Sequence, residues 1–116
     1  MDRLKQRSDF LRAARGIRRV TPGLTLEICP NAAPDAVRVG FTASRKVGNA
    51  VIRNRAKRRL RAVAAEILAA GGLPGTDYVL VARRDTATRP FENLKADLAQ
   101  ALRAAHVKLG RPGDAQ

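Results

Sequence analysis

Cationic side chains dominate the middle of this chain, and their spacing is that of a helix. Between residues 36 and 65 there is no Asp or Glu, whereas the same stretch holds Arg38, Arg45, Lys46, Arg53, Arg55, Lys57, Arg58, Arg59 and Arg61. Guanidinium groups donate hydrogen bonds in a fixed plane that suits phosphate oxygens, so this run can bind a polyanion. An ordinary solvated helix face interleaves Asp and Glu to relieve repulsion, and this one does not.

Residues for catalysis are sparse by comparison. The single His106 falls in the last turn of an expected helix, where an imidazole is usually solvated or complements the helix dipole. The 10 acidic residues are scattered without a close carboxylate pair, and we find no Cys/His metal spacing, phosphate loop or nucleophile elbow. The sequence therefore predicts a binding protein, with no catalytic or metal site of its own.

Composition narrows the class of partner. A chain of 116 residues with a net charge of +13 fits one domain that binds a polyanion, nucleic acid before an anionic membrane. No apolar run approaches membrane-spanning length, and the N-terminus lacks a secretory signal. The lone Cys29, in an apolar stretch, is expected to be an inert strand residue of a cytoplasmic protein without membrane contact.

The basic run must be positioned by a long helix between two strands. Asn49 is the expected N-cap, and the helix should end near Ala70, before two glycines. The apolar arc of this helix, which should pack on a sheet, comprises Ile52, Ala56, Leu60, Val63, Ala64 and Ile67. A strand with alternating apolar residues precedes it at 37–44, and another follows at 78–83.

The remaining elements complete the order helix, strands, helix, strand, helix. Ser8 or Asp9 should cap a short first helix that stops at Gly16. Extended stretches are expected at 17–20 and 24–29, a turn at 30–35 and a final helix at 91–109. We predict an α/β (α+β) two-layer sandwich in a single RNA-binding domain, residues 1–109, with a disordered tail at 110–116.

Segment 38–61 closely resembles the signature of the bacterial ribonuclease P protein subunit. The core of the match is Gly-Asn-Ala-Val at 48–51, Arg-Asn-Arg at 53–55 and Lys-Arg at 57–58. The likeness extends over roughly residues 8–105, and a match over so many positions in the right element order is specific. Arg-Asn-Arg alone would be a weak signal.

This resemblance implies a small protein that joins a large catalytic RNA, one copy per RNA. The holoenzyme of that family is an endonuclease that removes the 5′ leader from precursor tRNA. The chemistry would belong to the RNA and its Mg²⁺ ions, so no cofactor would be bound by the protein alone. The family also implies a left-handed crossover through the basic helix, although general statistics favour a right-handed one.

Two RNA-binding surfaces follow from the resemblance. The catalytic RNA would dock on Arg45, Lys46, Gly48, Asn49, Arg53, Asn54, Arg55, Arg58 and Arg61. The single-stranded leader would lie in a cleft between the first helix and the sheet, against Phe10, Leu26, Ile28 and Lys57. A second aromatic of many relatives is replaced here by Ala14, and the strand carries no tyrosine, so leader stacking should be weaker.

Three other classes of protein compete with this interpretation. A ribosomal or ribosome-associated RNA-binding protein of similar α/β architecture is the main alternative. A protein-only nuclease would need paired carboxylates or a usable histidine. A DNA-binding regulator would need a recognition helix in a helix-turn-helix pair and, usually, a dimer surface.

Overall fold

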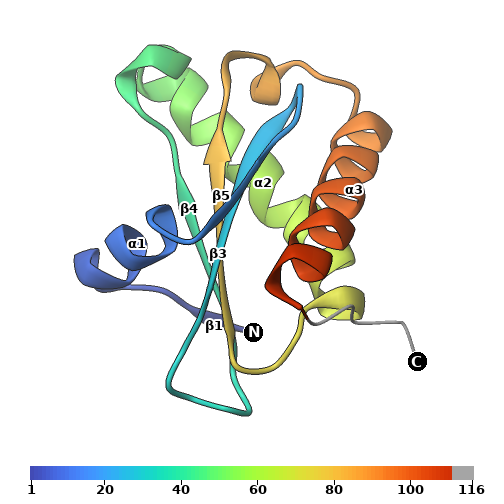
Figure 1. The fold of residues 1–116 in the computed structure, drawn as a ribbon. Coiled ribbons are helices and arrows are strands. Elements are labelled where there is room, and N and C mark those ends of the chain that lie inside the picture. The colour runs from blue at the N-terminus through green and yellow to red at the C-terminus, as the bar shows by residue number, and fades with distance from the viewer. Residues whose placement is uncertain (111–116) are drawn as a thin grey trace.

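A mixed five-stranded sheet in the order β1-β4-β5-β3-β2 organises the chain (Figure 1). The structure is a computed structural model and describes residues 1–110. In chain order the elements are β1 (Asp2–Arg3), α1 (Arg7–Ala14), β2 (Ile17–Val20), β3 (Leu24–Pro30), β4 (Val37–Thr42), the 3₁₀ helix η1 (Arg45–Val47), α2 (Ala50–Gly71), β5 (Thr76–Ala82), the 3₁₀ helix η2 (Arg84–Ala87) and α3 (Phe91–Leu109). The predicted mixed α and β class is confirmed.

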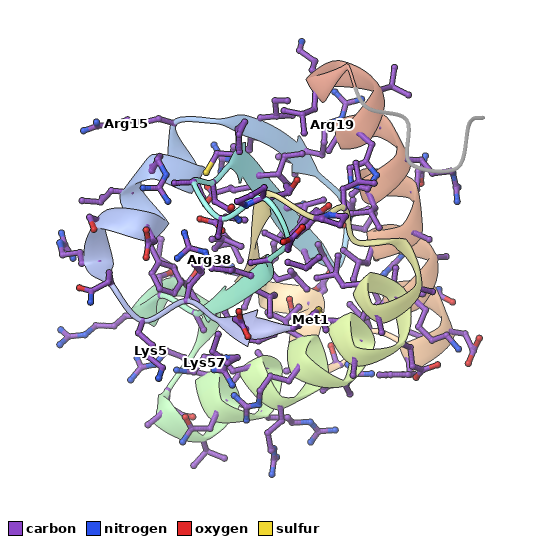
Figure 2. The ribbon with its side chains drawn as sticks, turned by 90° about the horizontal axis from the view of Figure 1, so that it is seen from below. Met1, Lys5, Arg15, Arg19, Arg38 and Lys57 are labelled. Atoms are coloured by element: carbon purple, nitrogen blue, oxygen red, sulfur yellow. The ribbon has the colours of Figure 1, made fainter. Side chains whose placement is uncertain are left out.

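Strands β4 and β5 are parallel neighbours joined by α2. In Figure 1 both strands run upward, β5 lies to the right of β4 and α2 passes behind the sheet, so the crossover is left-handed. Helix α3 lies on the same face as α2, whereas α1 packs on the opposite face and is seen at the left of Figure 1, at about the mid-height of the sheet. Figure 2, seen from below, separates these layers, with α2 on one side of the sheet and α1 on the other.

Two apolar clusters fill the two faces of the sheet. The larger one lies beneath α2 and α3 and includes Leu60, Val63 and Tyr78, as the arc predicted for the basic helix requires. The smaller one lies beneath α1 and contains Leu4, Ala13, Cys29 and Val79, with Phe10 and Val81 packed against it. Successive residues of a strand point to opposite faces, which is why Tyr78 and Val79 belong to different clusters.

Three details differ from the sequence prediction. Strand β1, which pairs with Arg38 and Val39 of β4, was not expected. Neither Ser8 nor Asp9 caps α1, because the helix begins at Arg7 after Gln6, which makes no side-chain cap. Of the predicted tail, Gly110 ends α3 in a left-handed conformation, and the rest lies outside the described residues.

His106 was expected to be solvated or to complement the dipole of the final helix, and its placement in solvent was wrong. Its side chain is buried, with Nε2 2.7 Å from the Tyr78 hydroxyl and the two rings edge to face. The backbone N–H of Leu73 donates to the same hydroxyl at 2.8 Å. The last turns of α3 still face the core, where Ala105 is also buried, so His106 is held by the fold.

Candidate nucleic-acid interface

The basic helix begins at a corner that only glycine allows. Gly48 has a φ of +152°, and a Cβ there would lie 2.9 Å from Cβ of Ile52. The Asn49 side chain then accepts the backbone N–H of Ile52 at 3.0 Å, as predicted for an N-cap. Because the first turn of α2 contains no acidic residue, its N-terminal N–H groups and partial positive charge favour an anion.

The outer face of α2 carries the predicted docking residues together. Asn54, Arg55, Arg58 and Arg61 are exposed, and within residues 1–110 none of these three arginines is in a salt bridge with a carboxylate. Arg53 is half-buried and its Nη1 donates to the Gly48 carbonyl at 3.4 Å. The exposed arginines of this face remain available to phosphates. Bound phosphates would neutralise these arginines and so relieve the repulsion between them.

Arg59 differs from its neighbours because it faces inward. Its Nη1 and Nη2 donate to the carbonyl oxygens of Thr86 and Arg89, each at 2.5 Å. Burial, and then the nearby charge of Arg55, lower the pKa of Arg59. This guanidinium is a structural link between α2 and the connection from β5 to α3.

The residues predicted for the leader do not form one cluster. Phe10 lies on the α1 face, where a Cβ at Gly40 would come within 2.5 Å of its ring, so the ring rests on the bare backbone of β4. Lys57 is half-buried on α2. Its label stands at the lower left of Figure 2, and α1 also lies at the left of that view, although on the opposite face of the sheet.

The placement of Leu26 and Ile28 in the cleft was wrong. Both side chains have no exposed area and belong to the core beneath α2 and α3. The alternation of β3 instead directs Thr25 and Glu27 toward the α1 face. Burial raises the pKa of the Glu27 carboxyl, and the opposing charge of Arg18, 4.0 Å away, lowers it in part.

A cluster of charges fastens α1 to the sheet. Asp77 of β5 has a fully buried side chain that accepts hydrogen bonds from Arg38 at 2.7 and 2.8 Å, from Arg12 of α1 at 3.0 Å and from Asn31 at 2.9 Å. Asp9 of α1 completes the cluster through Arg12 at 2.9 Å and Arg38 at 3.5 Å. Burial alone would raise the pKa of Asp77, but these hydrogen bonds outweigh it and the pKa is lowered.

Above α1, the same face of the sheet opens into a basic groove of about 620 Å³. Its walls are the β2–β3 turn, η1 and the end of β5 with η2, which meet at the upper end of the sheet in Figure 1. The cationic residues that line it are Arg18, Lys46, Arg83 and Arg84. Of these, only Lys46 was predicted from the sequence.

The other groove arginines were missed for a physical reason. Arg83 and Arg84 directly follow the buried strand β5, which places both at the end of the sheet. Arg83 precedes the 3₁₀ helix η2 and Arg84 begins it, and so short a helix has no periodic sequence pattern that would reveal it. Arg45, which was predicted from the sequence, is the first residue of η1. It is exposed and directly precedes the groove residue Lys46 in the chain.

Two further properties concern metals and membranes. Within residues 1–110, no three His, Cys, Asp or Glu side chains are grouped as ligands for a metal ion. None of the described helices is both long and apolar enough to cross a membrane.

Comparison with known proteins gives a consistent picture. The family model described as Ribonuclease P matches residues 1–106. The ribonuclease P protein component of Ruegeria pomeroyi is 53% identical over 107 residues, covering 90% of this chain and 86% of the relative. That of Paramagnetospirillum magneticum is 48% identical over 109 residues, covering 89% and 81%.

Solved structures agree with these sequence matches. The RNase P protein from Thermotoga maritima superposes with a TM-score of 0.73 at 25% identity, covering 88% of this chain and 96% of that one. The RNase P protein of Staphylococcus aureus gives a TM-score of 0.72 over 98% of this chain and 99% of that one, at 23% identity, which is a likeness of fold.

Proposed function

The chain belongs to the family of ribonuclease P protein components, and we propose that it docks on the catalytic RNA of that ribonucleoprotein through the outer face of α2. The observation that carries this proposal is a set of exposed arginines, Arg55, Arg58 and Arg61, that form no salt bridge within residues 1–110, on a helix whose start is fixed by Gly48 and Asn49. Arg45 and Lys46 would extend the contact at the amino end of the helix. The ribosomal alternative receives no support from the comparisons.

We assign the leader of precursor tRNA to the α1 face. Phe10 would stack on an unpaired base beside Gly40, while the groove arginines Arg18, Arg83 and Arg84 would hold the phosphates that follow. Lys57 would act at the margin between the docking helix and this face. A single strand suits the site because it presents unstacked bases and phosphates to one surface.

We place the hydrolytic chemistry in the RNA and its Mg²⁺ ions. Supporting this, the carboxylates buried within residues 1–110 are each already bound by an arginine: Asp9 by Arg12, Asp77 by Arg38, and Asp97 by Arg89 at 2.6 Å. A carboxylate held in this way is poorly suited to act as a general base or a metal ligand. We also propose that one copy of the protein binds each RNA. The complex would act in the cytoplasm, where tRNA precursors are made.

The test is reconstitution with a bacterial ribonuclease P RNA and a precursor tRNA. We expect cleavage at low Mg²⁺ only when RNA and protein are combined, and none by the protein alone. The double variant Arg55→Ala/Arg58→Ala should weaken RNA binding and flatten the slope of log affinity against log salt by about 1.4 to 1.8 for two lost phosphate contacts.

A matched control removes the same charge elsewhere. Arg103 and Lys108 are exposed on α3, away from the proposed docking face, so Arg103→Ala/Lys108→Ala should leave the slope nearly unchanged. A folded Arg55/Arg58 variant with the wild-type slope would refute the docking assignment. Specific cleavage by the RNA-free protein would refute the location of the chemistry.

A further inference from the structure

Arg59 faces inward on α2, whereas Arg55, Arg58 and Arg61 of the same helix are exposed. Its planar guanidinium spans two carbonyl oxygens, those of Thr86 and Arg89, that lie at η2 and just after it. Two donors fixed in one plane define the separation and direction of both acceptors. Arg59 thereby fixes the connection between β5 and α3 against the docking helix.

The same connection is one wall of the basic groove. The hydroxyl of Thr86 donates to the Gly23 carbonyl at 2.5 Å and accepts the backbone N–H of Arg83 at 2.8 Å. Arg83 also donates through Nη1 to the carbonyl of Thr21. The docking helix, η2 and the β2–β3 turn therefore meet at one buried residue, Thr86, whose carbonyl accepts Arg59.

We propose that Arg59 is a positioning residue. It holds the basic groove, where the leader is proposed to bind, at a fixed position relative to the outer face of α2, and it does so without contacting RNA. The proposal rests on the function proposed above. The protein sets the distance between the catalytic RNA, bound on the outer face of α2, and the basic groove. A precursor tRNA held by that RNA can place its leader in the groove only if this distance and orientation are kept. Arg83 and Arg84 line the groove, and their placement depends on where η2 is held.

The test uses Arg59→Lys in the reconstituted holoenzyme, because this change keeps the charge and removes the two-carbonyl fork. We expect the affinity for the catalytic RNA and its salt slope to stay within twofold of wild type. The ratio of affinities for precursor and mature tRNA should fall by about two- to tenfold. Arg58→Ala is the matched control on the adjacent residue, and should give the reverse pattern: weaker RNA docking and an unchanged ratio.

Two results would overturn the proposal. One is a loss of RNA affinity and salt slope in Arg59→Ala equal to that in Arg58→Ala, which would make Arg59 a phosphate contact. The other is an unchanged precursor-to-mature ratio in a folded Arg59→Lys holoenzyme.

Hydrogen exchange of the free protein provides a second measurement that needs no RNA. Amides of residues 83–89 should exchange faster in Arg59→Lys than in wild type, while those of β3 stay protected. Thr86→Val, which removes the hydroxyl but keeps the carbonyl, should loosen the same segment and reduce the same ratio. Unchanged exchange at 83–89 would refute the link directly. If wild-type holoenzyme itself shows no preference for precursor tRNA, the leader assignment fails, and exchange still decides the role of Arg59.

Discussion

Replacing Asp77 by Asn should loosen α1 from the sheet. The substitution keeps the size of the side chain but leaves Arg38 and Arg12 facing an amide instead of a carboxylate. Removing one partner of a buried ion pair costs about 3–5 kcal/mol. Because the Arg38 and Arg12 side chains keep 27% and 47% of their exposure, solvent screens part of the loss, and we expect about 2–3 kcal/mol.

The pH dependence of this loss identifies its cause. Since the folded state lowers the pKa of Asp77, the carboxylate stabilises the fold fully above its unfolded pKa of about 3.9, and this stabilisation disappears as pH falls through the folded value. The difference between wild type and Asp77→Asn should thus be constant near neutrality and shrink below about pH 4.

Urea denaturation at a series of pH values measures this difference, and hydrogen exchange locates it. Exchange should accelerate first in α1, which is anchored by Asp9 and Arg12 of the same cluster. An equal-volume control is Asp35→Asn, an exposed acidic residue in the turn before β4. A free energy of unfolding within about 0.5 kcal/mol of wild type at pH 7 would refute the reasoning, as would a difference that does not diminish in acid.

Two further predictions concern single side chains. Phe10→Ala should weaken binding of precursor tRNA by about 1–3 kcal/mol while leaving mature tRNA nearly unaffected; equal losses for both substrates in a titration would show that Phe10 only anchors α1. His106→Ala should lower the free energy of unfolding by about 1–3 kcal/mol, because the Tyr78 hydroxyl loses a buried partner. Activity of the folded His106 variant at saturating protein should match wild type, and a slower cleavage step would contradict a purely structural role.

Periodicity and capping chemistry made the large elements predictable. The long basic helix was expected from Asn49 to about Ala70 and is observed as Ala50–Gly71, because its apolar arc and its terminal glycines agree. The final helix was likewise expected and observed at 91–109. The docking residues could be placed on one face because a single helix carries them.

Side-chain direction was harder to predict where tertiary contacts decide it. Leu26 and Ile28 alternate correctly, but both faces of β3 are covered, and the sequence alone could not say which face belongs to which helix. Arg59 lies outside the apolar arc of α2, yet its side chain turns inward to bond the carbonyls of Thr86 in η2 and of Arg89 just after it. Strand β1 spans two residues, so its pairing depends on β4 and not on local propensity.

Gly40 has a consequence for how this sequence can vary. The ring of Phe10 occupies the space that a β-carbon at residue 40 would need, with Cε1 at 2.5 Å and Cζ at 2.6 Å from that position. Two positions thirty residues apart are therefore coupled: an alanine or serine at 40 would displace the Phe10 ring, and a smaller residue at 10 would leave room for it. In an alignment of relatives, these positions should covary, and an aromatic residue at 10 should accompany glycine at 40.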